Sequence, residues 1–472
     1  MLSPTMRELK REDFRNTLTV AIDPATAKDF DDAISYKKLD NGNHEIGIHI
    51  ADVSHFVKPG SDMDKEAREK TTSTYLVGKV LHMLPSSLSE GDASLVEGKE
   101  RLTFSAIFEL DDNAQVLTRR FAKTTIIVNN GLSYEKAQGI LDGDIQETEE
   151  LTQALHTLMR LSLKMRKQRE DSGAIGFSTV EVEFEFDQDG EVTGAHAKKY
   201  LKTMGMIEDF MLLANKEVAT YINEKCLGKK SCIGIYRVHD APDAERLAEL
   251  NVFLRAINKP LKIAKDGTVS PQEINRVLQS VKGTEYEKVV SVAILRSMAK
   301  AIYTHNNIGH FSLGFKNYTH FTSPIRRYPD IMVHRILAAL LSGVDLGKHE
   351  LEAYQKLAQT STEKEIEAVK AERASVKAAL ATLFQDKVGQ TFKGEITGVT
   401  DFGIFVSELS TRAEGMVHIS KLPGGDYYEL DAARFQLVGK RTKNKFQIGQ
   451  KLNIKLVRVN VERNQIDWQV IV

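Results

Sequence analysis

Four aspartates crowd into ten residues near the start of the chain. Asp23, Asp29, Asp31 and Asp32 follow the pattern D-x5-D-x-D-D. Carboxylates this close repel one another, so a fold that gathers them needs an offsetting charge, most simply a divalent cation. Oxygen-only ligands at a partly open site favour magnesium or manganese over zinc. Such ions activate water and neutralise phosphate charge, so the pattern indicates hydrolytic phosphoryl transfer.

Two other interpretations of the acidic stretch compete with this one. A calcium loop of the EF-hand type fails, because a loop that starts at Asp29 puts Ile34 where the invariant glycine belongs. An exposed acidic turn stabilised by side-chain bonds to its own backbone remains open on spacing alone. The sequence contains no G-x-S-x-G, P-loop or H-E-x-x-H motif that would indicate another chemistry.

Strand-like segments must position these aspartates. Residues 17–22 and 33–36 flank the acidic stretch, and a third strand is expected at 45–50 after the turn 40–43. Helical apolar spacing covers 204–224, 286–304 and 350–383. Short strand candidates punctuated by glycine follow at the end of the chain. They cover 391–399, 403–406, 415–419, 451–459 and 465–472.

Five short strands in about 80 residues suit a small closed barrel of the OB type. We therefore expect an α+β protein, in which a large mixed α/β catalytic domain precedes a small OB-fold barrel. The expected boundaries are a lead-in at 1–15, the catalytic domain at 16–385 and the barrel at 387–472.

Composition excludes several classes of protein. The 472 residues are 42% hydrophobic and 27% charged, as in ordinary globular proteins. No stretch approaches the ~20 apolar residues of a membrane span, and the start lacks a secretory signal, so we expect a cytoplasmic protein without membrane association. Cys226 and Cys232 match neither a zinc pair nor a disulfide framework, and we expect both to be reduced thiols.

Charge is distributed unevenly along the chain. The net charge is −1, but the segment 387–472 has 13 Lys and Arg against 9 Asp and Glu, a surplus of +4. Between 440 and 458 there are seven basic residues and no acid. A basic C-terminal barrel predicts salt-sensitive binding of nucleic acid, although a solvated strand pair on a protein-binding barrel would look the same.

Several ordered motifs resemble the RNase II/RNase R family of 3′-to-5′ exoribonucleases. The acidic stretch with its flanks, 20–33, reads VAIDPATAKDFDDA, and GIHIADVSHFV follows at 47–57. Met83-Leu84-Pro85, YRVHD at 236–240 and HFTSPIRRYPD at 320–330 come next, in the order of the family. The resemblance runs from about residue 11 to the C-terminus. So many ordered blocks argue strongly against the inert acidic turn.

The resemblance implies roles for individual residues. Asp23, Asp29, Asp31 and Asp32 would hold catalytic Mg²⁺, with Mn²⁺ as a substitute, and loss of Asp31 would abolish cleavage. Arg326 would contact the scissile phosphate, where a planar guanidinium stabilises developing charge. Glu372 matches a family glutamate near the site.

Aromatic and acidic residues would hold the RNA. By resemblance, Tyr75 and Phe177 clamp the last bases, because stacking tolerates any sequence. Tyr134 is expected to recognise ribose, whose 2′-OH separates RNA from DNA. An acidic residue in the block at 207–215 would also touch ribose, and the sequence leaves open whether it is Glu208 or Asp209.

The barrel resembles the OB-fold RNA-binding domain named after a ribosomal protein of the small subunit. Phe402, Phe405 and His418 are the side chains expected on its binding face. Family members usually carry cold-shock barrels before the catalytic domain and a lysine-rich extension after the last barrel. We expect this chain to lack both, either as a truncated form or as a naturally short member.

Together these features predict a magnesium-dependent hydrolytic exoribonuclease. It would degrade single-stranded RNA processively from the 3′ end as a monomer and release nucleoside 5′-monophosphates, and the sequence leaves open whether structured RNA is a further substrate. One alternative is a catalytically silent RNA clamp, although a silent protein has no need to retain mutually repelling carboxylates. The other is a phosphate-dependent exonuclease, which would release nucleoside diphosphates.

Overall fold

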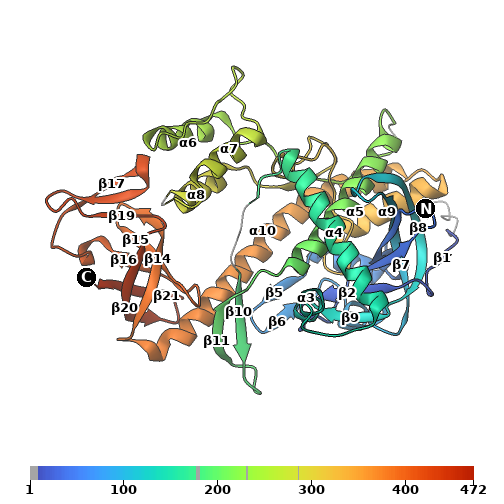
Figure 1. Cartoon of the computed structure of the whole chain (residues 1–472), viewed down its shortest axis with the longest axis horizontal. Helices are drawn as coiled ribbons and strands as arrows, with labels where there is room; N and C mark the ends of the chain where they lie inside the picture. Colours follow the sequence, from blue (N-terminus) through green and yellow to red (C-terminus); the bar gives the residue numbers. More distant parts are fainter. Residues whose placement is uncertain (1–8, 177–180, 230–231, 285, 472) are drawn as a thin grey trace.

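The computed structural model describes residues 9–176, 181–229, 232–284 and 286–471. Figure 1 shows a β-sheet body at one end of the molecule and a small barrel at the other, joined by the long helix α10 (Lys348–Phe384). Three helices, α6 (Ala244–Ala256), α7 (Pro271–Val281) and α8 (Glu287–Ser297), lie near the barrel.

A seven-stranded sheet forms the body, in the order β1-β8-β7-β4-β3-β2-β9. The strands are β1 (Glu12–Asp13), β2 (Thr19–Asp23), β3 (Asp32–Lys38), β4 (His44–Ala51), β7 (Glu100–Leu110), β8 (Val116–Ile127) and β9 (Asn130–Ser133). Central strand β4 is covered on both faces, because Ile46, Ile48 and Ile50 are fully buried on one face and His49 and Ala51 are fully buried on the other. Strands β2 and β3 are antiparallel neighbours, and their connection therefore lies at one edge of the sheet.

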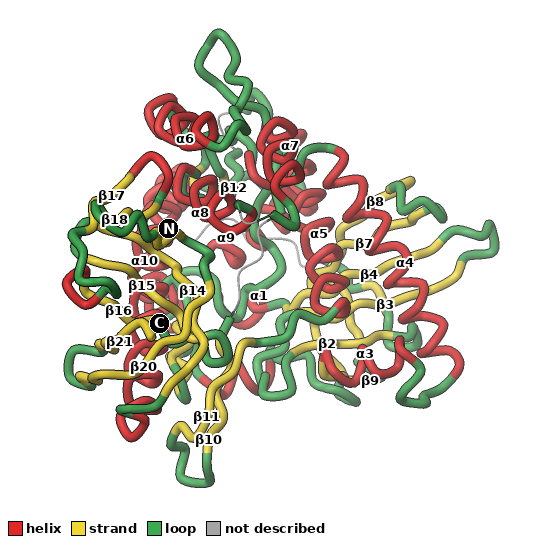
Figure 2. Tube along the Cα trace, turned by 60° about the vertical axis from the view of Figure 1, so that its left-hand side comes forward, coloured by secondary structure: helices red, strands yellow, loops and turns green. Residues whose placement is uncertain are grey.

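Helices cover the sheet, and Figure 2 shows α4 and α5 crossing it. Serine or threonine caps begin several of them. The Ser133 hydroxyl accepts the backbone N–H of Lys136 at the start of α3, and Thr148 caps α4 in the same way. The body helices are α1 (Val53–Phe56), α2 (Asp62–Lys70), α3 (Tyr134–Asp142), α4 (Glu149–Asp171), α5 (Lys202–Cys226) and α9 (Tyr328–Ser342).

Three short strand pairs lie outside the large sheet. They are β5 (Thr74–Leu76) with β6 (Lys79–Leu81), β10 (Val182–Phe186) with β11 (Val192–Ala197), and β12 (Tyr236–Val238) with β13 (Ile302–Thr304). The prediction of one helix over 286–304 was wrong at its end. The helix stops at Ser297, and 302–304 instead pairs with β12, because tertiary pairing overrides the local apolar spacing.

The C-terminal region contains a closed five-stranded barrel, β14-β15-β16-β21-β20, as the strand pattern predicts. Its strands are β14 (Thr391–Thr400), β15 (Gly403–Glu408), β16 (Glu414–His418), β20 (Lys451–Asn460) and β21 (Gln465–Ile471). A three-stranded sheet that was not predicted lies between β16 and β20 in sequence. It consists of β17 (Tyr428–Asp431), β18 (Gln436–Gly439) and β19 (Lys445–Gln447).

Two large hydrophobic cores hold the described part of the chain together, and α10 contributes to both. Tyr354 and Ala358 pack into the core of the sheet body. At the other end of the helix, Leu380 and Phe384 join the core of the barrel, where the rings of Phe384 and Trp468 meet edge to face at 5.8 Å. This second core also includes residues of α6, α7 and α8, so the barrel and these three helices form one packing unit.

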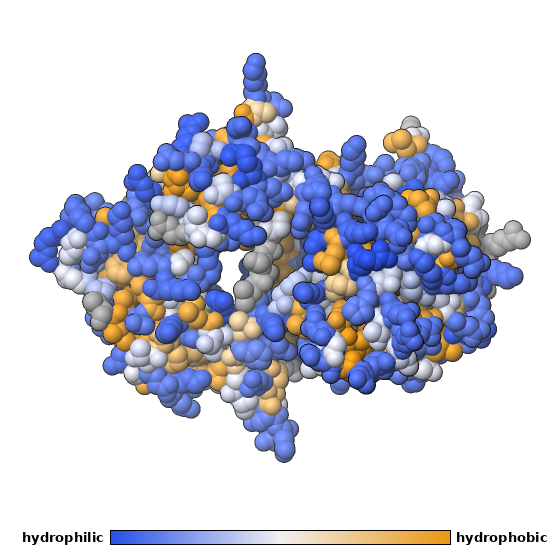
Figure 3. Space-filling view, in the orientation of Figure 1, coloured by the Kyte–Doolittle hydropathy of each residue, from blue (hydrophilic) through white to orange (hydrophobic). Residues whose placement is uncertain are grey.

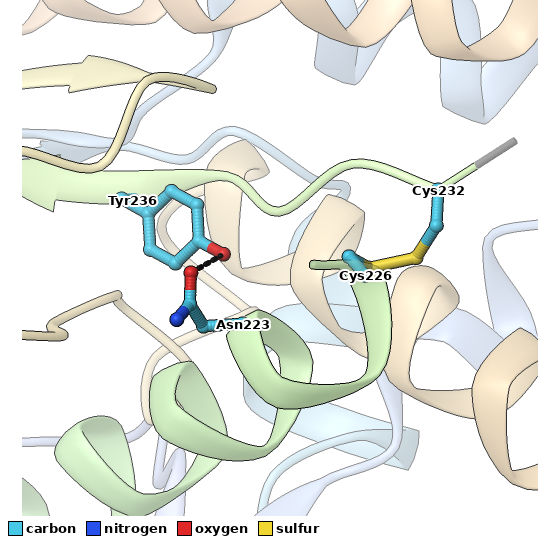
Figure 4. Close-up of a disulfide and its surroundings, with 4 residues drawn as sticks. All are labelled: Asn223, Cys226, Cys232 and Tyr236. Atoms are coloured by element: carbon cyan, nitrogen blue, oxygen red, sulfur yellow. Dashed lines mark hydrogen bonds between the residues drawn. A yellow bond between two sulfur atoms is a disulfide. The ribbon is translucent and has the colours of Figure 1, made fainter. Parts of the chain in front are cut away.

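The structure corrects the expectation of two reduced thiols. Cys226, the last residue of α5, forms a disulfide with Cys232, and their Cα atoms are 5.0 Å apart (Figure 4). The chain reverses direction between α5 and β12, and this reversal brings together two cysteines that are close in sequence. Nearby, the Tyr236 hydroxyl donates to Asn223 Oδ1 at 3.4 Å, which also joins α5 to β12.

No helix in the described ranges is both long enough and apolar enough to cross a membrane.

Candidate active site

The four aspartates lie where β2 ends and β3 begins. Asp23 is the last residue of β2, Asp32 is the first residue of β3, and the connecting loop carries Asp29 and Asp31. Because β2 and β3 are antiparallel, both aspartate-bearing ends meet at the same edge of the sheet. Parallel strand β9 ends at this edge too, where Ser133 pairs with Asp23, so Tyr134 follows directly.

A cavity of about 800 Å³ opens at this edge. It brings together residues that are up to 304 positions apart in sequence, from Asp23 to Arg327. Eight of the predicted site residues line it: Asp23, Asp29, Asp31, Asp32, Tyr75, Tyr134, Glu208 and Arg326. Predictions drawn from separate motifs therefore converge on one cavity.

Burial and mutual repulsion make the carboxylates costly to ionise. Burial, and then the charge of Asp29, raise the pKa of Asp23 to about 7. Burial is also the main cause that raises the pKa of Asp31 and Asp32 well above the usual range, and the charge of Asp23 adds to it at Asp32. Asp23 Oδ2 is buried without a hydrogen-bond partner. A cation would relieve each of these penalties.

Neighbouring aspartates influence one another electrostatically. Asp23 interacts with Asp29 and with Asp32, and Asp32 also interacts with Asp31. Across the described ranges, no three acidic, histidine or cysteine side chains gather closely enough to hold a metal ion by themselves. Magnesium is typically bound through one or two carboxylates together with water and substrate phosphates, and pairs of carboxylates fit such an ion.

Asp31 contacts the loop that carries Arg326. Asp31 Oδ1 accepts the backbone N–H of Ile325 at 2.8 Å, and Asp31 Oδ2 lies 3.8 Å from Arg326 Nε. The guanidinium also donates to Ser323 Oγ at 3.2 Å. The arginine is therefore held beside the carboxylates while its side chain stays partly exposed, which suits a group that binds an incoming phosphate.

Buried polar contacts fix the Arg326 loop in place. Asp330 Oδ1 accepts the backbone N–H of Ser323 and a guanidinium N–H of Arg327, each at 2.8 Å. The Tyr328 hydroxyl donates to Asp64 Oδ1 at 2.8 Å and accepts from Arg335 at 2.9 Å. Because these partners are buried, breaking any of these contacts would leave an unpaired polar group in the interior.

Tyr75 lies on the β5–β6 hairpin and lines the cavity. Its hydroxyl donates to Asp29 Oδ2 at 2.9 Å, and its backbone N–H donates to Glu372 Oε1 at 3.0 Å. Burial, followed by the charge of Asp29, raises the pKa of Tyr75, so the hydroxyl remains a donor. Glu372 is not among the described residues that line the cavity, and its contact with the site runs through Tyr75.

Helix α5 separates the two candidate ribose acids. Glu208 lines the cavity. Asp209 points to α4 instead, where it accepts from Ser162 at 2.7 Å, Arg166 at 2.8 Å and Arg169 at 2.7 Å. Successive helical residues face directions about 100° apart, which explains why neighbours occupy different environments. The geometry favours Glu208.

Of the remaining predicted RNA contacts in the body, Tyr134 lines the cavity and Phe177 lies outside the described residues. Burial, and then the charge of Asp32, raise the pKa of Tyr134. Its hydroxyl therefore stays protonated beside the carboxylates.

The predicted barrel residues share one region of its surface. The rings of Phe402 and Phe405 meet edge to face at 6.2 Å, and Phe402 is 47% exposed. His418 is exposed and pairs in register with Gly403, which directly follows Phe402. The basic run 440–458 begins at the end of β18 and extends through β19 into β20.

Among the further residues that line the cavity, three are charged and one carries an amide: Glu181, Lys198, Arg327 and Asn215. Sequence reasoning did not identify them. Arg327 follows Arg326 in the SPIRRY block and could have been considered there. Asn215 ends the block at 207–215, which indicates an acidic contact to ribose and no role for the amide. Glu181 and Lys198 lie at the base of the β10–β11 hairpin, where only the fold brings them to the cavity.

Comparison with known proteins agrees with this architecture. Residues 11–343 match the RNB domain family, and residues 385–470 match the S1 RNA binding domain family. The chain is 36% identical over 466 residues to Ribonuclease R 1 of Lactococcus lactis. This alignment covers 97% of the chain but 56% of the relative, so the chain spans little more than half the length of that protein.

Two solved structures are similar throughout the chain. Mycoplasma genitalium RNase R in complex with ribose methylated single-stranded RNA is 29% identical, with a TM-score of 0.89, and the match covers 100% of this chain and 74% of that one. The same enzyme in complex with double-stranded RNA is 28% identical, with a TM-score of 0.84, and 98% and 76% of the two chains are covered. The chain therefore belongs to the RNB family of the RNase R type, with a C-terminal S1 domain.

Proposed function

We propose that this protein is a hydrolytic 3′-to-5′ exoribonuclease that depends on magnesium and releases nucleoside 5′-monophosphates processively. The convergence of Asp23, Asp29, Asp31, Asp32 and Arg326 on one cavity carries this proposal. Family membership supports it, since RNB-type ribonucleases are generally dependent on divalent metal ions.

Mg²⁺ is the ion that we propose for the site, with Mn²⁺ as a substitute. Oxygen ligands arranged in pairs suit these hard cations. The ion would be held by Asp23, Asp29, Asp31 and Asp32. Asp23 Oδ2 is the best candidate ligand atom, because it is buried and has no hydrogen-bond partner. When bound, the metal would supply an activated water and neutralise phosphate charge.

The chain's own residues would position and stabilise the reacting linkage. We assign Arg326 to the scissile phosphate, because its guanidinium is held next to Asp31 yet remains partly exposed. Its fixed donors would meet negative charge as it develops on the phosphate oxygens. Asp31 has a second task, since its Oδ1 holds the backbone just before this arginine. Glu372 would act as a positioning residue through Tyr75.

Recognition of the RNA end is assigned to the walls of the cavity. Tyr75, and Phe177 by family resemblance, would stack on the last bases, which permits movement along any sequence. Tyr134 and Glu208 would contact ribose hydroxyls, since both line the cavity and can donate or accept hydrogen bonds.

The S1 domain would hold RNA upstream of the 3′ end. Phe402, Phe405 and His418 supply ring surfaces, and the basic run 440–458 supplies charge. Single-stranded RNA is the proposed substrate. Structured RNA is a second proposed substrate, because the similar Mycoplasma enzyme has been seen with double-stranded RNA. We place this activity in the cytoplasm, where cellular RNA is degraded.

One assay distinguishes hydrolysis from its two alternatives. RNA labelled at its 5′ end is incubated with Mg²⁺ or with EDTA. The label follows the shortening RNA, and the released mononucleotide, which carries no label, is identified by chromatography. Stepwise shortening with Mg²⁺, release of nucleoside monophosphates and loss of activity in EDTA are expected. Nucleoside diphosphates, formed only when phosphate is added, would show a phosphorolytic enzyme. Intact RNA that remains bound to the protein would show a silent clamp.

A further inference from the structure

The catalytic cavity carries more negative than positive side chains. Only three of the described lining residues are cationic: Lys198, Arg326 and Arg327. Six are acidic: Asp23, Asp29, Asp31, Asp32, Glu181 and Glu208. Every RNA phosphate that enters brings a further negative charge. Each cation in this lining is therefore a candidate for holding the backbone.

Two of the three cations already have assigned partners. Arg327 is bound to the buried carboxylate of Asp330 at 2.8 Å and 3.0 Å. Arg326 lies beside Asp31 and is assigned to the scissile phosphate. Lys198 remains, and no role has been assigned to it.

The partner of Lys198 is weakly held. Lys198 Nζ lies 3.5 Å from Glu181 Oε2, at the outer limit of hydrogen bonding. The side chain of Glu181 is 72% exposed, while that of Lys198 is 31% exposed. A long, exposed ion pair contributes little stability, so a phosphate oxygen can replace the carboxylate at the ammonium group.

The backbone around Lys198 is better fixed than its ion pair. Lys198 N donates to Glu181 O at 2.9 Å, directly beyond the pairing of Val182 with Ala197 that closes the hairpin. Ala197 N donates to Ser410 O of the S1 domain at 2.8 Å. Lys198 therefore lies on the cavity wall next to the S1 domain. Figure 3 shows the molecular face hollowed between the barrel and the sheet body, above the projecting hydrophilic tip of this hairpin.

We propose that Lys198 binds a backbone phosphate in the 3′ segment of the RNA, and that Glu181 competes with this phosphate for the ammonium group. The proposal rests on the proposed function for the identity of the ligand, which is single-stranded RNA. It adds a binding contact between the S1 domain and the carboxylates, and it predicts opposite effects for changes at the two members of one ion pair.

The test is equilibrium binding of a fluorescent single-stranded oligoribonucleotide in EDTA, over a range of salt concentrations, with RNA integrity checked on a gel. Lys198→Ala is expected to weaken binding several-fold and to lower the slope of log affinity against log salt by about 0.7, the value for one phosphate on a single strand. Glu181→Gln is expected to tighten binding. Lys199→Ala is the matched control, because Lys199 is exposed and is not among the described lining residues.

Equal affinity and equal salt slope for Lys198→Ala and Lys199→Ala would overturn the phosphate contact. Unchanged or weaker binding by Glu181→Gln would overturn the competition. Thermal unfolding of each variant shows whether its fold is retained, and Lys198→Gln provides a second neutral substitution. The assay needs no hydrolysis, so a protein that binds as expected but does not shorten RNA with Mg²⁺ would refute the proposed function and leave this contact standing.

Discussion

At the scale of single residues, Asp31 combines a charge with a structural contact. Its Oδ1 holds the backbone of Ile325, and Oδ2 faces Arg326. Asp31→Asn keeps an oxygen that can accept the Ile325 N–H, so the arginine loop should stay in place while the charge is lost. We expect RNA shortening to fall at least roughly 100-fold, as when a preorganised electrostatic group is removed. Gel analysis of labelled RNA measures this.

Asp40→Asn is the control for this experiment, because Asp40 is an exposed aspartate in a turn away from the cavity. It should shorten RNA at the wild-type rate. Full activity in Asp31→Asn would refute the role assigned to that carboxylate.

Tyr75 permits its ring and its hydroxyl to be tested separately. Tyr75→Ala removes the stacking surface, worth about 1–3 kcal/mol per base, so digestion should end at longer fragments. Tyr75→Phe removes only the hydrogen bond to Asp29 and should keep the wild-type end length. High-resolution gels of the final products compare the two. If Tyr75→Ala stops at the wild-type length, the clamp assignment is wrong.

Sequence reasoning identified individual site residues where a motif names them, and it missed those that only the fold brings together. The close spacing of the four aspartates was visible in one short stretch. The choice between Glu208 and Asp209 depended on which side of α5 faces the cavity, and a motif does not show this. Lys198 and Glu181 are separated by a hairpin, and neither lies in a recognised block.

At the scale of elements, strand β4 buries a histidine in a polar pocket. His49 accepts from or donates to Ser105 at 2.7 Å and Ser35 at 2.8 Å, and burial lowers its pKa to about 3. The folded state therefore binds fewer protons than the unfolded state between pH 3 and 6.5, and stability falls as pH drops through this range. From pH 7 to 5 the loss is about 2 kcal/mol for this group.

His49→Gln should remove this contribution, because an amide has no proton to gain over this range. Urea unfolding at pH 7 and pH 5 should show a smaller acid-induced loss in the variant than in the wild type, by about 2 kcal/mol. An identical loss in both proteins would show that His49 does not titrate between the two states.

Elements with a strong local pattern were predicted well. Residues 350–383 became α10, and all five predicted barrel strands formed. The error at 302–304 arose because a short apolar segment has no clear period, and its strand partner β12 lies more than 60 residues earlier in the chain. The three short strands β17, β18 and β19 carry few alternating residues and gave no signal.

At the scale of the whole molecule, α10 links the two ends of the proposed RNA path. Its first half packs in the sheet core, its middle holds the Tyr75 hairpin through Glu372 and Ser375, and its end packs in the barrel core. The barrel is also joined to α8 by the ion pair between Lys288 and Glu395. None of this packing between regions could be predicted, because the periodicity of a segment shows an apolar face without showing what covers it.

The S1 domain should matter only for RNA long enough to reach it from the cavity. Phe402→Ala removes an exposed ring from its surface. We expect binding of a long single strand to weaken by about 1–3 kcal/mol, while an oligonucleotide of a few residues binds as before. Fluorescence anisotropy with the two RNAs tests this. Equal loss for both lengths, or no loss for either, would argue against the assigned platform.

The central claim is that the aspartates at the ends of β2 and β3 hold divalent ions against the last linkage of the RNA. Anomalous diffraction from crystals soaked in Mn²⁺ tests this most directly, with an RNA degradation assay run on the same preparation. We predict an anomalous peak among Asp23, Asp29, Asp31 and Asp32. A cavity without manganese at saturating Mn²⁺, in a preparation that still degrades RNA, would contradict the account.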